Sequence, residues 1–311
     1  MTVLTLLQPG QPANIATADG TVLPFRPVTA LPDRSLVRLS RSCPGVPLRI
    51  FCFPWSGAGA SAYRAHAEAV WAQIEIVGIQ LPGRGTRRSE SACTQLEAPA
   101  EQAAQAIRAD LQARPSRFAV LGHSYGALLA YETARLLEAA ELIPEATVLS
   151  ASRTPDTPPP FPLHGLNDLQ LTQQLGQMGG LSPDRLCDPA FMGYLLPIAR
   201  SDLTACETYA PVGAQPLKCP VISWAGDEDW YAPPADVVKW QQYADSAYRH
   251  REFPDGHFFI NDIPAVTTAL MADLHWVRSH ESARTPGNSQ SDIVVRSRGT
   301  AVGASHLRPA A

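Results

Sequence analysis

The stretch "LGHSYGALLAYETARLLEAAE", residues 121–141, decides the fold class of this chain. The apolar run FAVLG leads into this stretch, and an amphipathic helical pattern forms its second half. Between the two, Ser124 stands between Gly122 and Gly126 in the order Gly-x-Ser-x-Gly. A strand, this turn and a helix form the context in which a serine is held out as a nucleophile, and small flanking residues permit its strained backbone. A merely tight turn is the alternative interpretation.

Short continuous apolar runs alternate with helical patterns on both sides of this stretch. Such alternation predicts a mostly parallel central sheet with helices on both faces, and together with the serine turn it predicts an α/β-hydrolase fold. The runs that we expect to be strands are residues 48–53, 74–80, 117–123, 145–151, 220–226 and 248–253. The segments that we expect to be helices are residues 62–73, 98–113, 127–142, 234–245 and 264–280.

Residues 155–217 interrupt this alternation. The segment begins with the proline-rich TPDTPPPFP, and helical patterns follow at 166–180 and 191–209 without any strand pattern. A helical insertion between two strands of such a sheet predicts a lid that gates access of substrate to the strand ends. A purely structural helical excursion is the alternative.

The two ends of the chain differ from the middle. Residues 1–45 are rich in Pro, Thr and Ala and predict a loosely ordered N-terminal extension with room for one short strand. Residues 281–311 are polar and rich in Ser, Gly and Arg, which predicts a disordered C-terminal tail. Residues 46–280 then form one α/β-hydrolase domain that includes the lid.

Composition excludes several classes of protein. The net charge of −4 and the lack of a long basic run argue against nucleic acid as a partner. No apolar stretch approaches the roughly 20 residues that span a bilayer, and the N-terminus lacks the basic start of a signal peptide. None of the 6 cysteines forms a Cys-x-x-Cys pair, so we expect neither a metal site nor disulfides but reduced thiols in a cytoplasmic protein.

A serine is a poor nucleophile at neutral pH and needs a base. In this fold the acid and the histidine follow the serine in chain order. His257, in FPDGHFFI directly after the last predicted strand, lies where a loop can deliver an imidazole to Ser124. A histidine on a surface loop is the alternative for His257. We expect His123, beside the serine, to support packing of the turn.

Three carboxylates compete for the role of the acid. The strand at 220–226 is followed by Asp227, Glu228 and Asp229. The spacing Gly-x-x-Asp at this strand end selects Asp229, with Asp227 as the alternative. This acid would orient the imidazole and stabilise its charged form.

An oxyanion hole requires two backbone N–H groups. One is expected from Tyr125, the residue after the nucleophile. The other is expected from the loop FPWSGAG after the first predicted strand, where we select Ser56, with Trp55 as the alternative. A flexible turn without this role is the simpler interpretation of the loop.

Several blocks together resemble the type II thioesterases, stand-alone α/β-hydrolases that accompany nonribosomal peptide and polyketide synthases. They are FCFPWSGAGASAYR, LPGRGTR, GHSYGALLAYETA, SASRTPD, ARSDLTACETY, AGDEDW and FPDGHFFI, and the similarity covers residues 46–280. The family's nucleophile, acid and base map to Ser124, Asp229 and His257, and its early oxyanion amide falls on Ser56.

The resemblance implies a substrate and a partner. The substrate would be an acyl or aminoacyl group in thioester linkage to the phosphopantetheine arm of a carrier protein, and hydrolysis would restart a stalled synthase. Members of this family often work as cytosolic monomers, and acyl transfer from Ser124 to water needs no cofactor or metal. Three alternatives remain: a general esterase or acyl-CoA thioesterase, a stand-alone thioesterase that releases the finished product, and a non-catalytic binding protein.

Overall fold

An eight-stranded sheet forms the centre of the molecule. The computed structural model describes residues 15–16, 22–23, 34–40, 48–211, 213–283 and 294–296. The strand order is β10-β9-β8-β7-β6-β4-β5-β3. The strands are β3 (Leu36–Arg38), β4 (Leu48–Phe53), β5 (Glu75–Ile79), β6 (Arg117–His123), β7 (Thr147–Ser150), β8 (Val221–Gly226), β9 (Tyr248–Phe253) and β10 (Val294–Arg296). Every neighbouring pair is parallel except β3–β5, which confirms the predicted mostly parallel sheet.

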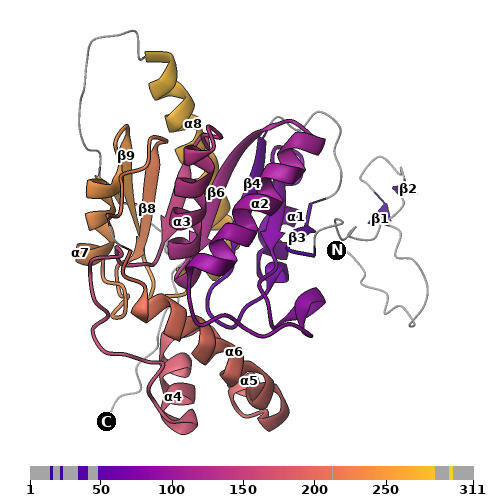
Figure 1. Ribbon diagram of the computed structural model, residues 1–311, viewed down its shortest axis with the longest axis vertical. Coiled ribbons are helices and arrows are strands. Elements are labelled where there is room, and N and C mark those ends of the chain that lie inside the picture. Colours follow the sequence, from indigo (N-terminus) through magenta and orange to yellow (C-terminus); the bar gives the residue numbers. More distant parts are fainter. Residues whose placement is uncertain are drawn as a thin grey trace, which may run out of the picture.

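Helices cover both faces of this sheet, as the alternating pattern predicts (Figure 1). Helices α2, α3 and α7 pack on one face, and α1 and α8 pack on the other. Their bounds are α1 (Arg64–Val70), α2 (Glu97–Ala113), α3 (Tyr125–Ala139), α7 (Pro234–Val237) and α8 (Ile263–Ala283). Two predicted helices differ in detail: α1 follows the short 3-10 turn Ala60–Tyr63, and α7 passes into the 3-10 turn Val238–Tyr243.

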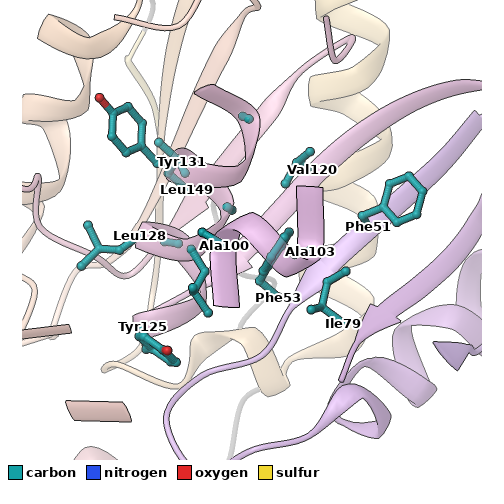
Figure 2. Packing of buried hydrophobic residues seen from close by; sticks show 14 of the residues in the cluster. Phe51, Phe53, Ile79, Ala100, Ala103, Val120, Tyr125, Leu128, Tyr131 and Leu149 are labelled. Atoms are coloured by element: carbon teal, nitrogen blue, oxygen red, sulfur yellow. The ribbon is translucent and has the colours of Figure 1, made fainter. Parts of the chain in front are cut away.

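Alternating side chains of the central strands divide the core into two layers. In β4, Phe51 and Phe53 point into the layer beneath α2 and α3, which Figure 2 shows from close by. Ile50 and Cys52, between them in sequence, point into the layer beneath α1 and α8. Because successive side chains of a strand face opposite sides, a strand covered on both faces is buried throughout, as in LRIFCF. Its single charged residue, Arg49, is paired with Glu75 and Asp110.

The predicted helical insertion lies between β7 and β8. It consists of α4 (Asp168–Met178), α5 (Pro183–Leu186) and α6 (Pro189–Thr208), which gather at one end of the sheet in Figure 1. We call these three helices the lid. The lid has its own apolar cluster, which also includes Tyr231 from the loop after β8.

The N-terminal segment contains a short strand of the kind for which its sequence leaves room. Within the segment that we expected to be loosely ordered, residues 36–38 form the edge strand β3, which pairs antiparallel with β5. Leu36 is buried in the main core, so packing rather than composition determines the structure there. Residues 15–16 and 22–23 form a separate antiparallel pair, β1 (Ile15–Ala16) with β2 (Val22–Leu23).

The prediction of a disordered tail falls mostly outside the described residues. Helix α8 continues to Ala283, three residues beyond the predicted end at residue 280. Residues 294–296 form β10, which pairs parallel with β9 at the edge of the sheet.

Candidate active site

The turn between β6 and α3 holds Ser124 in a strained backbone conformation. Ser124 has φ 57° and ψ −123°, a region that non-glycine residues rarely occupy. Such a residue costs about 1–3 kcal/mol and persists only where its surroundings enforce it. Here the Ser124 N–H donates to the Ser150 carbonyl at 2.8 Å. The serine therefore projects from the end of β6 rather than continuing the strand.

The two flanking glycines are required by close contacts in the backbone. A Cβ on Gly122 would lie 1.9 Å from the Gly126 carbonyl oxygen. A Cβ on Gly126 would lie 2.2 Å from the carbonyl oxygen of Phe53, at the end of β4. Real Cβ atoms do not come this close to backbone oxygens, so the Gly-x-Ser-x-Gly pattern reflects the packing of β6, α3 and β4 around the turn.

Ser124, His257 and Asp229 form a continuous chain of hydrogen bonds. The Ser124 Oγ and His257 Nε2 are 2.9 Å apart, and His257 Nδ1 and Asp229 Oδ2 are 2.7 Å apart. Since a carboxylate only accepts, His257 Nδ1 is the donor to Asp229 and its Nε2 is free to accept the serine proton. The imidazole and the carboxylate are both buried, while Ser124 is half-buried. This arrangement can activate a hydroxyl as a nucleophile.

The two aspartates that compete for the role of the acid have separate positions. Besides His257, Asp229 accepts hydrogen bonds on Oδ1 from the N–H groups of Tyr231, at 2.9 Å, and Ala232, at 3.0 Å. Asp227 instead accepts from the N–H of Asp255, at 3.1 Å, on the loop that carries the histidine. The structure thus brings Asp229 to the imidazole and leaves Asp227 supporting the loop.

His123 packs beneath this hydrogen-bonded chain, as expected, and does not join it. Its Nδ1 lies 2.9 Å from the Ser150 hydroxyl, and its ring lies against Trp55, His257 and Phe258. Burial, helped by the nearby His257, lowers the pKa of His123 well below its usual value. The ring is therefore neutral at physiological pH and adds no charge below the site.

The candidate oxyanion amides lie on either side of the serine turn. Tyr125 is the first residue of α3, where a backbone N–H has no partner within the helix. In the loop after β4, residues 54–59, the amides of Gly57 and Ala58 are already bonded, to Asp202 at 2.8 Å and to the Trp55 carbonyl at 3.0 Å. The amide of Ser56 precedes these two. We call residues 54–59 the oxyanion loop.

The lid and the segment that joins α4 to α5 contact the site at several places. A Cβ on Gly57 would meet Leu195 Cδ1 of α6 at 2.6 Å, and a Cβ on Gly180 would meet the Phe258 ring at 2.3 Å. The Tyr231 hydroxyl donates to Glu207, on α6, at 2.8 Å. The lid thus rests directly against the oxyanion loop and the residues that flank Asp229 and His257.

Arg84 and Asp202 form a part of this site that we did not assign from the sequence. The PGRG block and the lid block ARSDL contain them, but neither suggested a role. The guanidinium makes two bonds to the carboxylate, at 2.5 and 2.7 Å, and the carboxylate also accepts from Gly57 N–H. Asp202 stands at helical spacing between the apolar residues Ala199 and Cys206, and a charged residue on such a stripe was the available signal.

The fold and this hydrogen-bonded serine, histidine and aspartate define a hydrolase of the α/β-hydrolase class. A family model described as "Thioesterase domain" matches residues 48–275, and the chain belongs to this family as a type II thioesterase, an enzyme that hydrolyses thioester bonds.

Individual relatives agree with this assignment. Thioesterase PikA5 of Streptomyces venezuelae is 33% identical over 227 residues, which cover 73% of this chain and 80% of that protein. The gramicidin S biosynthesis protein GrsT of Aneurinibacillus migulanus is 32% identical and covers 68% of this chain and 83% of its own length. The solved type II thioesterase BorB, from the borrelidin biosynthetic cluster, is 28% identical with a TM-score of 0.71, covering 78% of this chain and 98% of that one. Among the described residues, no helix is long and apolar enough to cross a membrane.

Proposed function

We propose that this chain removes acyl or aminoacyl groups from the phosphopantetheine arms of carrier domains in a nonribosomal peptide or polyketide synthase. The observation that carries the proposal is the Ser124–His257–Asp229 chain of hydrogen bonds beneath a helical lid. The relatives named for gramicidin S and borrelidin biosynthesis support the synthase context. The role that follows is editing, which frees carrier domains blocked by wrong or stalled groups.

Acylation begins at Ser124. Its Oγ attacks the thioester carbonyl carbon while its proton passes to His257 Nε2, which lies 2.9 Å away. Asp229 holds the imidazole in the correct tautomer and stabilises the imidazolium that forms. Collapse of the tetrahedral intermediate breaks the carbon–sulfur bond, and the departing thiolate takes the proton from His257. A thiolate is a good leaving group, so little acid assistance is needed.

Deacylation reverses the roles with water in place of the serine. His257 takes a proton from water, the hydroxide attacks the ester carbonyl, and the Ser124 oxygen leaves with that proton. The balance is thioester plus water giving carboxylic acid plus thiol. Every bond change uses the serine, the imidazole and water, so we propose a reaction without cofactor or metal.

We assign the oxyanion hole to the N–H groups of Ser56 and Tyr125. Tyr125 begins α3, whose helix dipole favours negative charge at this end. Ser56 is supported by the bonding of the next two amides, which fixes the turn around it. Removal of one such donor typically costs about 100- to 1,000-fold in kcat.

The proposed substrate also indicates the partners and the cellular location of the protein. Carrier domains are the partners that we propose, while the net charge of −4 argues against nucleic acid. Cys52, Cys93, Cys187, Cys206 and Cys219 are free thiols, which fits a reducing cytosol. We propose a cytoplasmic monomer without membrane attachment, and light scattering on the purified protein tests its oligomeric state.

The decisive experiment compares three substrates on the wild type and on Ser124→Ala. They are an acyl-phosphopantetheinyl carrier protein, the same acyl group on CoA, and a nitrophenyl ester. We expect the highest kcat/KM for the carrier-bound thioester and loss of all three activities in Ser124→Ala. Equal rates for the carrier and CoA thioesters would instead favour a general esterase. Faster cleavage of a full-length product than of stalled intermediates would favour product release, and activity surviving in Ser124→Ala would overturn the mechanism.

A further inference from the structure

A buried carboxylate of the lid holds the oxyanion loop in place. Asp202 lies on α6, and its Oδ2 accepts the Gly57 N–H at 2.8 Å. The same carboxylate makes two bonds to Arg84, at 2.5 and 2.7 Å. Asp202 is 1% exposed and Arg84 is 3% exposed. A contact between residues 57 and 202 therefore joins the lid to the loop that carries the Ser56 amide.

The loop depends on this contact for its shape. Gly57 has φ +80°, so the chain reverses directly after Ser56, and the Gly57 N–H points to the lid instead of to the loop. Arg84 adds a second restraint, because its guanidinium donates to the Ala58 carbonyl at 3.3 Å and to the Pro82 carbonyl at 3.2 Å. The orientation of the Ser56 peptide thus depends on the position of α6.

Stability alone is a poor explanation for this pair. Burying two charges costs several kcal/mol each before their attraction is counted, and a well-packed apolar pair is often as stable. A buried ion pair that also accepts a backbone N–H holds that part of the backbone in one position. The N–H that this pair holds belongs to Gly57, the residue after the proposed oxyanion donor Ser56. An error of about 1 Å in the position of a catalytic group can cost roughly 100-fold in rate.

We infer that Asp202 is a positioning residue that sets the oxyanion loop, so the site is competent only while α6 is docked on the core. The inference rests on the proposed function, specifically on Ser56 as an oxyanion donor. Movement of α6 would take the carboxylate away from Gly57 and relax the loop. Opening of the lid to admit a carrier arm would then switch hydrolysis off until the lid closes.

The test uses Asp202→Ala and a matched control on the same helix. Arg200 also makes three hydrogen bonds, to the carbonyls of His164 and Leu166 and to Asp168, but all of them lie within the insertion. Arg200→Ala therefore loosens the lid without touching the oxyanion loop. Each variant is assayed for kcat and KM and for inhibition by an alkyl trifluoromethyl ketone, which adds to an active serine and places an oxyanion in the hole.

We expect Asp202→Ala to lower kcat roughly 10- to 100-fold with KM changed less than about threefold. The inhibition constant of the ketone should rise by the same factor, because an interaction made only in the transition state is lost from both. Arg200→Ala should keep kcat and ketone affinity within about threefold of the wild type.

Asp202→Asn provides a second variant if Asp202→Ala does not fold. Its amide oxygen still accepts from Gly57 N–H, and Arg84→Met in the same chain removes the unpaired guanidinium. This double variant should retain most of the ketone affinity, whereas Asp202→Leu with Arg84→Met should lose it. Equal ketone affinity in both double variants overturns the inference alone. A wild type that the ketone does not inhibit, or an active Ser124→Ala, overturns the proposed function instead.

Discussion

The serine turn and the lid are held by different kinds of contact. At the turn, backbone atoms of β6, α3 and β4 pack so closely that Gly122 and Gly126 leave no room for a single methyl group. In the lid, Gly193 and Gly179 have open space around them, and Leu169 and Tyr194 are 70% and 51% exposed.

This difference distinguishes a rigid serine turn from a lid that is attached at few points. The catalytic geometry is enforced by dense local packing, which tolerates no change in volume. The lid is a thin layer with a small apolar cluster, joined to the core by a few buried polar side chains such as Asp202 and Glu207. Changes to the turn should therefore abolish structure or activity, while changes to the lid should be mild unless they touch those polar contacts.

The largest effect should come from the acid of the hydrogen-bonded chain. In Asp229→Asn the remaining oxygen stays with the two backbone N–H groups that Oδ1 accepts, so the NH2 group faces His257 Nδ1 and favours the wrong tautomer. We expect kcat to fall by about 10⁴-fold. Asp227→Asn is the matched control, since among the described residues the Asp227 side chain accepts only from the Asp255 N–H. It should change kcat less than about tenfold. Steady-state kinetics with the carrier-bound thioester measure kcat of both variants. A larger loss of kcat in Asp227→Asn than in Asp229→Asn would assign the acid to Asp227.

The next effect should be on folding. Gly122→Ala places a methyl group 1.9 Å from the Gly126 carbonyl, which belongs to the backbone and cannot move aside. We expect the free energy of unfolding to fall by about 3 kcal/mol or more, as for other severe overpacking. Urea denaturation measures this change. A loss below about 1 kcal/mol would show that the turn is looser than these contacts indicate.

Much of the turn could be predicted from the sequence because its signals are local. Glycine, serine and glycine stand within five residues between a strand pattern and a helix pattern, and chain order then points to His257. The contact of Gly57 with Asp202 joins residues 145 positions apart. No local sequence pattern around either residue predicts it. Helical periodicity revealed the lid, but periodicity does not show how a lid is attached.

The sequence left room for one short strand in the N-terminal segment, but it could not place β3, for a related reason. Its three residues, Leu36–Arg38, lie in a segment whose composition is typical of loops. The strand exists because it pairs with β5, whose partner residues lie some 40 positions later, and because Leu36 fills the core. Short strands of this kind depend on tertiary contacts more than on their own residues.

Acid should destabilise the core through buried histidines. Burial lowers the pKa values of His66, His123 and His250, none of which belongs to the lid. As pH falls below about 6.5, these histidines bind protons in the unfolded chain but not in the folded chain. The folded state is therefore destabilised below that pH, and the stability present above it is lost. Each site contributes a slope of at most about 1.4 kcal/mol per pH unit.

His66→Gln tests this slope. The Nε2 of His66 donates to the Ile260 carbonyl at 2.9 Å, and a glutamine amide can replace that donor without titrating. Between pH 6.5 and 5, the variant should lose stability less steeply than the wild type, as measured by denaturant midpoints across pH. Parallel curves for the two proteins would mean that His66 binds its proton equally well in the folded and the unfolded chain, which would contradict a lowered pKa.

The smallest effect should come from Gly193→Ala in the lid. Gly193 lies inside α6, four residues before Pro197, whose ring cannot supply the N–H that the Gly193 carbonyl would otherwise accept. Outside the backbone of α6, a Cβ there meets no atom of the described residues within 4 Å. Alanine should therefore raise the free energy of unfolding by up to about 1 kcal/mol through helix propensity alone. Urea denaturation and kcat are measured together. An unchanged kcat fits a lid whose contribution depends on Asp202 rather than on bending of α6. A gain in stability with a fall in kcat would instead show that α6 must flex between Gly193 and Pro197 during turnover, and the contrast between a rigid turn and a tolerant lid would then fail at this position.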